Sequence, residues 1–264
     1  MALTFCSFSS GSSGNSYLIK SDESAILVDA GISGRKIFQS LQEVEVNLRE
    51  VSAVLITHEH TDHIKSLRTI TRKMPQIHTY ANSGTWKSIE ALVEEKQRVT
   101  FKTGDAFFIN DIKVKSFLLS HDAEEPVGFS FYKAGKQISI LTDTGFLSDD
   151  IYDEIKEADL LIIEANHDVE MLRIGRYPWF LKQRILGNKG HLSNVDAADA
   201  ICKILSEKQK YIHVLLAHLS RENNFPEMAY QTIKNLLEEK NYYIDTNICL
   251  NIIARDEMSA LYTV

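Results

Sequence analysis

Short apolar runs separated by small polar residues open the chain and predict β-strands. The runs cover residues 3–8, 16–19 and 25–28, and they are separated by a Ser/Gly/Asn stretch and by Ser21-Asp22-Glu23-Ser24. Short apolar runs bounded by turn-forming residues are typical of strands. We expect these three strands to be adjacent and antiparallel.

After Asp29 the apolar spacing changes, and helices alternate with strands. A helix is predicted near residues 34–44, a buried strand at 53–56, and then helix, strand and helix to about residue 95. The second half begins with strands at 107–109, 113–118, 128–132 and 138–141. It continues with strands at 160–163 and 213–216, helices at about 194–206 and 226–239, and a last strand at 248–253. Each half supplies a mixed sheet and helices to cover one face, which predicts an α/β fold of two packed sheets with helices outside.

Composition narrows the class of protein. The 264 residues are 44% hydrophobic and 25% charged, typical of a globular chain, and we expect a single domain over residues 1–264. The N-terminus has no secretory pattern and no apolar run is long enough for a bilayer, so we expect a cytoplasmic protein without a membrane partner. Three distant cysteines, Cys6, Cys202 and Cys249, are expected to be buried small hydrophobes. The net charge of −7 argues against a protein that coats nucleic acid through an overall positive potential.

One apolar strand ends in a cluster of metal-binding side chains. Residues 55–63 read Leu-Ile-Thr-His-Glu-His-Thr-Asp-His, which places His58, His60, Asp62 and His63 together. Histidines two residues apart at a strand end can point to the same side, while Asp62 and His63 face a neighbouring position at the turn into the next helix. Two adjacent metal sites follow. The alternative is that Asp62 caps that helix, but it leaves three histidines unexplained.

Further candidate ligands each follow an apolar strand. They are Asp29, His121, Asp143 and His218. Taken singly each is weak, because a strand-end aspartate often begins a turn. Together they fit a site that a rigid scaffold assembles from several strand ends.

In order along the chain, these segments resemble the metallo-β-lactamase superfamily. The matching motifs are Leu-Val-Asp29-Ala-Gly, His58-Glu-His60-Thr-Asp62-His63, His121, Leu-Thr-Asp143-Thr-Gly and Leu-Ala-His218-Leu-Ser. The resemblance implies a four-layer αββα sandwich with two metal sites. The first would use His58, His60, His121 and Asp143, and the second Asp62, His63, Asp143 and His218. Asp143 would bridge, and Asp29 would support the ligands from behind by hydrogen bonding.

The ligand types suit two divalent ions of zinc or manganese, with iron(II) also compatible. Two close cations would lower the pKa of a shared water to give hydroxide at neutral pH and would stabilise the charge that builds up during attack. Asp62 would also accept a proton from that water. The sequence predicts a hydrolase and leaves the native metal and the oligomeric state open.

A second pair of motifs bears on the substrate. Glu164-Ala-Asn-His167 and Gly190-His191-Leu-Ser193-Asn resemble the ribonuclease Z and phosphodiesterase branch of the superfamily. By that resemblance His191 would stabilise the transition state or protonate the departing oxygen. The alternative is that Ser193 or Asn194 is a helix N-cap and His191 a surface residue.

A cationic segment lies between these motifs. Residues 171–190 contain five basic and no acidic residues, interleaved with aromatic ones. Cations for phosphates and aromatic faces for stacking are what a frayed or single-stranded nucleic-acid end requires. The candidate contacts are Arg173, Arg176, Tyr177, Trp179, Lys182, Arg184 and Lys189. The alternative is an amphipathic helix whose aromatics pack inward.

The Ser/Gly-rich residues 9–16 are a third candidate for phosphate contact. Successive N–H groups of Ser12, Ser13, Gly14 and Asn15 could form an anion-binding nest, or the segment could be a plain hairpin connection. Arg221 and Asn223, just after a ligand, could also touch a phosphate, although Arg221 could instead pair with Glu222 or Glu227. With these segments the chain is similar to the YycJ/WalJ group, which implies a DNA exonuclease acting from 5′ ends, with DNA favoured over RNA and a part in mismatch repair.

Two alternatives stay open. A small-molecule or cyclic-nucleotide phosphodiesterase would use the same ligands, because one fold hosts many substrates. A non-catalytic metal-binding regulator is the other, although a structural zinc would need only one closed tetrahedral site.

Overall fold

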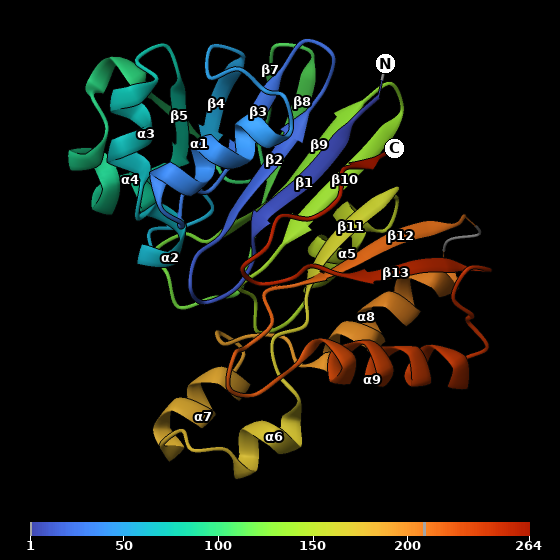
Figure 1. Cartoon of the computed structure of the whole chain (residues 1–264). Coiled ribbons are helices and arrows are strands. Elements are labelled where there is room, and N and C mark those ends of the chain that lie inside the picture. Colours follow the sequence, from blue (N-terminus) through green and yellow to red (C-terminus); the bar gives the residue numbers. More distant parts are fainter. Residues whose placement is uncertain (1, 208–209) are drawn as a thin grey trace.

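Two mixed sheets packed face to face form the centre of the computed structural model, which describes residues 2–207 and 210–264 (Figure 1). Each sheet has seven strands among the described residues. In spatial order the first contains β14 (Tyr262–Thr263), β1 (Thr4–Ser9), β2 (Ser16–Lys20), β3 (Ala25–Val28), β4 (Val51–Leu55), β5 (His78–Asn82) and β6 (Arg98–Phe101). The second contains β13 (Ile248–Ile252), β12 (Ile212–Ala217), β11 (Leu160–Glu164), β10 (Lys136–Leu141), β9 (Val127–Lys133), β8 (Ile112–Leu118) and β7 (Ala106–Ile109).

Each sheet changes from antiparallel to parallel pairing. β1, β2 and β3 pair antiparallel, which confirms the predicted arrangement, and β3 to β6 pair parallel. In the second sheet β7 to β10 pair antiparallel and β10 to β13 pair parallel. The carboxyl ends of parallel strands meet at one edge, so β3, β4, β10, β11 and β12 all end toward the same region.

Alternating side chains of each strand enter two different apolar layers, as strand geometry requires. On β11, Leu160 and Ile162 pack between the sheets, whereas Leu161 and Ile163 pack under helices. On β3, Ile26 lies between the sheets and Leu27 lies under the helices of the other face. Strands buried on both faces explain why these runs are continuously apolar.

Helices cover both outer faces, which confirms the αββα sandwich (Figure 1). The first face carries α1 (Gly34–Glu43), α2 (Thr61–Ile64), α3 (Leu67–Lys73) and α4 (Ser83–Ile89), with the 3₁₀ turns η1 (Glu90–Leu92) and η2 (Glu95–Gln97). The second carries α5 (Asp149–Ile155), α8 (Asn194–Glu207) and α9 (Pro226–Glu239). Two short helices, α6 (Val169–Ile174) and α7 (Trp179–Leu186), project from the rest of the molecule. No helix among the described residues has the length and apolar content to cross a membrane.

The structure differs from the sequence interpretation in several places, and it contains β6 and α5, which the sequence interpretation did not predict. The cationic segment forms two helices rather than one, because Gly175 ends α6 and Pro178 precedes α7. Strand β14 is only two residues long and pairs with β1 from the opposite end of the chain. Cys6 is buried as expected, but Cys202 and Cys249 are only half-buried, and all three are free thiols.

Candidate metal centre

Three strand ends turn through the left-handed region of backbone conformation. Asp29 after β3, Asp143 after β10 and His218 after β12 have φ angles of 62°, 63° and 54°. Non-glycine residues rarely adopt such angles, and where they do they often mark functional sites. All three side chains are buried. The structure thus places these three strand ends in the same backbone conformation and buries their side chains.

The first cluster consists of His58, His60 and His121, from the β4–α2 loop and the loop after β8. One ligand atom from each lies within 4.8 Å of the others. Nε2 of His58 is 3.1 Å from Nδ1 of His60, and the His121 ring centroid lies 5.2 Å from that of His58. Three imidazoles with converging nitrogens form one half of a metal site.

The second cluster consists of Asp62, His63 and His218, with the same 4.8 Å limit between ligand atoms. Asp143 lies between the clusters. Its Oδ2 is 3.3 Å from Nε2 of His63, and its Oδ1 is 3.9 Å from Nε2 of His121. Asp143 is therefore placed where a bridging carboxylate would have to be.

Two buried atoms in this region make no hydrogen bond with any described residue: Asp143 Oδ2 and His218 Nε2. Buried polar atoms are nearly always paired, so unpaired ones call for an explanation such as an ion. Imidazole nitrogens and carboxylate oxygens are suitable donors for zinc, manganese or iron(II). The residues present fit a divalent metal centre.

Hydrogen bonds from behind orient the imidazoles. Nδ1 of His63 lies 2.7 Å from Oδ2 of Asp29, whose carboxylate also accepts the Thr57 backbone N–H at 2.9 Å. Nδ1 of His121 lies 3.1 Å from the Gly190 carbonyl oxygen. Such bonds fix the ring so that Nε2 faces the metal position. Asp29 therefore occupies the supporting position expected for it.

Glu164, at the end of β11, holds two imidazoles with one oxygen. Its Oε1 lies 2.7 Å from Nδ1 of His218 and 2.8 Å from Nδ1 of His191. Its Oε2 accepts the Thr144 N–H at 3.0 Å. The sequence interpretation quoted Glu164 in a motif without giving it a role. Its position after an apolar strand, like that of Asp143, is the signal that could have found it.

The buried charges stabilise one another. Burial alone would raise the pKa of Asp143, but the charges of His218 and His63 hold it well below its usual range. Burial opposes ionisation of Glu164 too, yet His191 and His218 lower its pKa to about 2. Burial lowers and Glu164 raises the pKa of His191, which reaches about 9. Both carboxylates are therefore ionised at neutral pH.

A pocket of about 210 Å³ opens directly onto these ligands. His191 and the half-buried Asp62, for which the sequence analysis predicts catalytic roles, both line it. α7 and the loop after it form the opposite wall. The predicted substrate contacts that line it are Ser12, Tyr177, Arg184 and Lys189. Arg184 forms an ion pair with Asp122, which lines the same pocket.

Other predicted contacts lie away from this pocket. Nζ of buried Lys182 donates to the Arg173 carbonyl oxygen at 2.6 Å and so ties α7 to α6. Arg173 pairs with Glu170, and Trp179 is 66% exposed on the outer side of α7. Arg176, Ser193, Arg221 and Asn223 do not line the pocket either. The Ser193 hydroxyl caps α8 by accepting the Asp196 N–H, as its alternative interpretation expected.

The Ser/Gly loop lies under the centre. Asn15 is buried, its Oδ1 accepts the Gly11 N–H, and its Nδ2 lies 3.1 Å from Nε2 of His63. Gly14 has φ of 149° and packs so closely on the Gly31 carbonyl that a Cβ would lie 2.6 Å from it. Ser13 bonds to Asp256 instead. Within this loop, only Ser12 lines the pocket.

Several pocket residues escaped the sequence interpretation. Asn166 donates from Nδ2 to the His218 carbonyl oxygen at 2.9 Å and lines the pocket with Ser220. Leu181 and Ile185 contribute apolar walls from α7. Leu181 and Ile185 lie on α7, a separate helix after Pro178 that the sequence interpretation did not predict.

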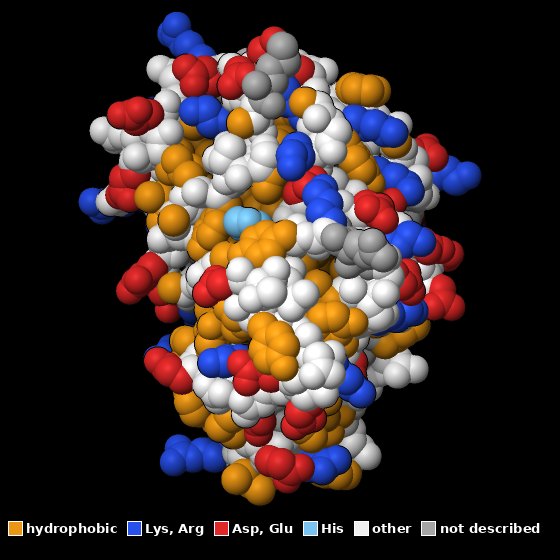
Figure 2. Space-filling view, turned by 90° about the vertical axis from the view of Figure 1, so that its right-hand side faces the viewer, with side chains coloured by type: hydrophobic (Ala, Val, Ile, Leu, Met, Phe, Trp, Pro, Cys, Tyr) orange, Lys and Arg blue, Asp and Glu red, His pale blue; other side chains and the backbone are white. Residues whose placement is uncertain are grey.

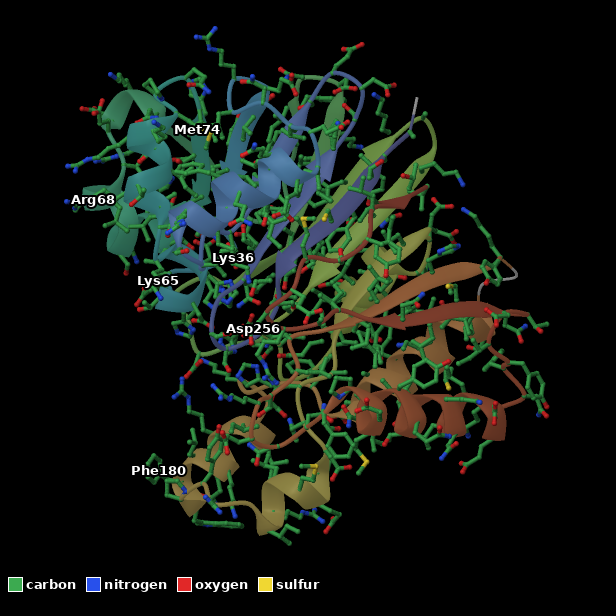
Figure 3. All side chains as sticks on the ribbon, in the orientation of Figure 1. Lys36, Lys65, Arg68, Met74, Phe180 and Asp256 are labelled. Atoms are coloured by element: carbon green, nitrogen blue, oxygen red, sulfur yellow. The ribbon has the colours of Figure 1, made fainter. Side chains whose placement is uncertain are left out.

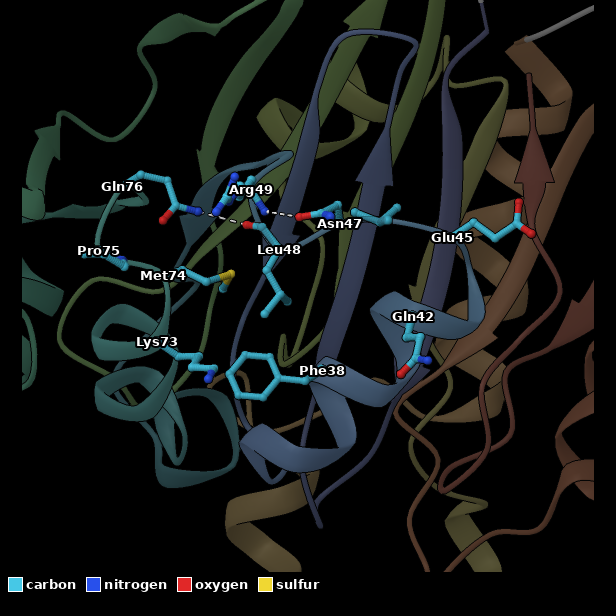
Figure 4. Close-up of a pocket in the computed structure, with 11 residues that line it drawn as sticks. Phe38, Gln42, Glu45, Asn47, Leu48, Arg49, Lys73, Met74, Pro75 and Gln76 are labelled. Carbon is cyan, nitrogen blue, oxygen red and sulfur yellow. Dashed lines mark hydrogen bonds between the residues drawn. The ribbon is translucent and has the colours of Figure 1, made fainter.

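Other hollows carry no comparable ligand set. The one shown in Figure 4 has a volume of about 820 Å³ and lies between α1 and the turn after α3. Its lining includes Phe38, Lys73 and Met74 but no histidine. A larger one of about 1120 Å³ adjoins the metal centre at His121 and Lys189.

Comparisons with known proteins agree with this geometry. The family model described as a β-lactamase superfamily domain matches residues 24–214. Exodeoxyribonuclease YycJ of Bacillus anthracis is 43% identical over 245 residues, which cover 92% of each chain. Exodeoxyribonuclease WalJ of Streptococcus pneumoniae is 44% identical over 235 residues, covering 87% of this chain and 86% of that one.

Solved structures show the same fold at low identity. The metallo-β-lactamase fold protein YhfI from Bacillus subtilis superposes with a TM-score of 0.74 at 14% identity, covering 98% of this chain and 99% of that one. The short form of human tRNase Z gives 0.64 at 18% identity, with 97% and 98% covered. These likenesses concern architecture alone.

Proposed function

This chain belongs to the metallo-β-lactamase superfamily, and from that premise we propose that it degrades DNA from 5′ ends as a two-metal exodeoxyribonuclease. Its class is that of a metal-dependent hydrolase, and its relatives indicate a nuclease. Membership of a class of hydrolases argues against the alternative of a non-catalytic metal-binding regulator. A part in DNA mismatch repair remains a prediction from the resemblance.

One observation supports a nucleic-acid substrate most directly. The pocket over the ligands is walled by the turn before α7, by α7 and by the loop after it, which present Tyr177, Arg184 and Lys189 respectively. An aromatic face for stacking and cations for phosphates are the groups that a strand end needs. Of these cations, Lys189 has no carboxylate within ion-pair distance among the described residues.

We assign His58, His60, His121 and Asp143 to one ion, and Asp62, His63, Asp143 and His218 to the other. When bound, such ions supply Lewis acidity, which lowers the pKa of water and neutralises charge on the phosphate. Asp62, at the first turn of α2, offers a carboxylate oxygen that accepts the proton of the attacking water.

His191 acts from the other side of the pocket. Its Nδ1 is held by Glu164, so Nε2 is left for the pocket, where it donates to a phosphate oxygen or to the leaving oxygen. Leu181 and Ile185 exclude water from that side. Glu164 therefore positions both a donor and, through His218, a ligand.

The test is cleavage of duplex DNA in manganese, labelled at the 5′ end in one sample and at the 3′ end in another. We expect early release of labelled mononucleotide from the 5′-labelled sample and a shortening ladder from the 3′-labelled one. Asp143→Asn is the matched control, because it keeps the side-chain shape and removes the bridging charge. Equal product from both proteins would show that the cleavage does not come from this centre.

The small volume of the pocket also fits a second candidate function. A volume of about 210 Å³ suits a single nucleotide or cyclic nucleotide. A small-molecule phosphodiesterase would hydrolyse bis(4-nitrophenyl) phosphate or cyclic nucleotides well and would be indifferent to polymer length. Rates that rise strongly with DNA length would favour the exonuclease.

A further inference from the structure

Acidic residues are missing from a long stretch next to the metal ligands. Residues 64–89 contain Lys65, Arg68, Arg72, Lys73 and Lys87 but no aspartate or glutamate. The chain as a whole has a net charge of −7, so this stretch departs strongly from its average. It directly follows His63, and its first half forms the end of α2 and all of α3.

Three of these cations form one strip on the outer surface, here called the α3 strip: Lys65, Arg68 and Arg72. Arg68 and Arg72 are four residues apart and therefore lie on one face of α3. Lys65 caps the C-terminus of α2, two residues before α3 begins. All three side chains are exposed. Lys36, near the start of α1, lies close by because Gly34 packs against Thr69 of α3.

None of the three cations of the strip is neutralised by a paired carboxylate among the described residues, in contrast to several other lysines of the molecule. Lys115, Lys133 and Lys210 each pair with an acidic side chain. For the α3 strip no Asp or Glu oxygen lies within 4.0 Å, counting every residue in 2–207 and 210–264. Glu94 is the acidic group whose charge interacts with Arg72, and it is itself 2.9 Å from Lys96. Arg68 donates only to the Ala91 carbonyl oxygen.

The strip borders the metal centre. Asp62 and His63 precede Lys65 on the same helical segment, and Asp62 lines the pocket. In Figure 3, Arg68, Lys65 and Lys36 lie on the same side of the molecule as Phe180 of α7, and α2 lies between the strip and α7. Figure 2 shows a face at right angles to this view, on the opposite side from α3, where lysines and arginines are mixed with acidic residues.

We propose that the α3 strip binds the sugar–phosphate backbone of duplex DNA behind the end that is cut. The inference rests on the proposed function and assigns the path of the DNA outside the pocket. The seven residue steps from Lys65 to Arg72, at the helical rise of 1.5 Å per residue, correspond to about 10 Å. That length matches about three steps between successive phosphates of one strand, which follow each other every 3.4 Å along the duplex axis.

The chemistry of the strip favours a duplex over a single strand. Proteins that hold single strands stack the bases on aromatic side chains. Residues 64–73 contain no aromatic residue, and the hollow of about 150 Å³ that Arg68 and Arg72 line has no aromatic side chain either. Cations that touch only phosphates carry no sequence information, as suits an enzyme that degrades any duplex.

The test compares two triple variants of equal charge change. One replaces Lys65, Arg68 and Arg72 with alanine. The matched control replaces Lys20, Lys113 and Lys240, which lie at the end of β2, near the start of β8 and directly after α9. None of them lines the pocket, and they likewise have no ion pair among the described residues. Alanine favours helix, and melting temperatures verify that both variants fold.

Binding of the metal-loaded protein to a 20-base-pair duplex with hydrolysis-resistant phosphorothioate ends is measured by fluorescence anisotropy across salt concentrations. For the strip variant we expect Kd to rise about tenfold and the salt slope to flatten by about 2.7, which is 0.9 for each of three lost phosphate contacts. The ratio of duplex cleavage to hydrolysis of the 4-nitrophenyl ester of thymidine 5′-phosphate should fall by a similar factor. The control variant should bind like the wild type.

Each outcome separates the two proposals. Equal Kd values and slopes for the strip and control variants overturn the strip, and so does an equal loss in both, since that reflects net charge alone. If the wild type cleaves no DNA while the strip variant alone loses binding, the proposed nuclease function fails and the binding surface is supported.

Discussion

A single carboxylate oxygen of Glu164 contacts both a metal-ligand candidate, His218, and the pocket histidine, His191. Both contacts are to Nδ1, so Glu164 fixes which nitrogen of each ring faces inward. Residues that orient ligands from behind commonly change metal affinity by ten- to a hundredfold when mutated. Glu164 therefore links the two halves of the centre.

We expect Glu164→Gln to weaken metal binding by about 10- to 100-fold and to lower kcat for DNA further, because the amide cannot hold two imidazoles by charge. Competition with a chromophoric chelator measures the first effect and cleavage kinetics measure the second. Glu170→Gln, at an exposed surface pair with Arg173, is the control. Wild-type metal affinity in Glu164→Gln would contradict this role.

Lys182 and Arg184 are close in sequence but differ in their contacts. Lys182→Met removes the hydrogen bond by which the buried Lys182 ties α7 to the part-buried Arg173 carbonyl, and we expect the free energy of unfolding to fall by about 1 kcal/mol. Arg184→Met removes an exposed ion pair, which contributes little to stability, but takes a cation from the pocket. Urea unfolding and DNA cleavage well below the melting temperature separate the two. Equal losses of cleavage would refute the distinction.

The sequence predicted the site unevenly at this scale. Histidines and aspartates after apolar strands could be found because ligand type and strand position are both visible in the chain. Lys182 and Ser193 could not be separated from true pocket residues, because which face of a short helix turns inward depends on packing. Asn15 was expected at a phosphate and lies beside His63, since a loop's direction is set by the strands it joins.

At the scale of elements, the turn after α7 controls the site. The Gly190 carbonyl faces Nδ1 of His121, and the next residue is His191. A Cβ on Gly190 would lie 2.1 Å from the Ile185 carbonyl oxygen, which is backbone and cannot move aside cheaply. The return from α7 into the sheet thus has room only for glycine.

We expect Gly190→Ala to displace this turn, to lower the melting temperature and to reduce kcat by at least about 100-fold through misplacement of His121 and His191. Gly187→Ala, in the same turn, is the control, because its nearest contact would be 3.2 Å away. Calorimetry and cleavage kinetics are the measurements. A Gly190→Ala protein as active as Gly187→Ala would show that the turn tolerates the change.

The other end of the second sheet offers a pH test. Asp159 directly precedes β11, its Oδ2 accepts the Gln137 N–H at 2.9 Å, and Lys210 and Lys136 pair with it. Burial opposes its charge, but Lys210 and these hydrogen bonds lower the pKa of Asp159. A lowered folded pKa stabilises the protein above the unfolded value and loses that effect as pH falls.

At pH 7 we expect Asp159→Asn to reduce the free energy of unfolding by about 1–2 kcal/mol. The difference from wild type should shrink below about pH 4, near the ordinary aspartate pKa, as the wild-type carboxyl protonates. Urea unfolding from pH 7 to pH 3 measures it. A difference that stays constant over this range would mean that the charge is not what stabilises the sheet.

For the whole molecule, the two central sheets could be predicted from the sequence better than the short edge strand β14. Apolar runs and helix periods are local, so the two sheets and their covering helices could be derived. β14 could not, because Tyr262–Thr263 form a strand only by pairing with β1 across the length of the chain. Nor could the α3 strip, which depends on which carboxylates lie near Lys65 and Arg72 in space.

Removing the metal tests whether the metal centre stabilises the whole fold. The centre collects strand ends from both sheets and leaves Asp143 Oδ2 and His218 Nε2 buried without a hydrogen bond to any described residue. Ions that bind only the folded chain stabilise it by about 4 kcal/mol at a thousandfold excess over Kd. For a chain of this size we expect chelation to lower Tm by about 8–16 °C. Scanning calorimetry with and without chelator measures it, and Asp143→Asn should show a smaller shift. An unchanged Tm after verified metal loss would mean that the ligands converge without needing an ion.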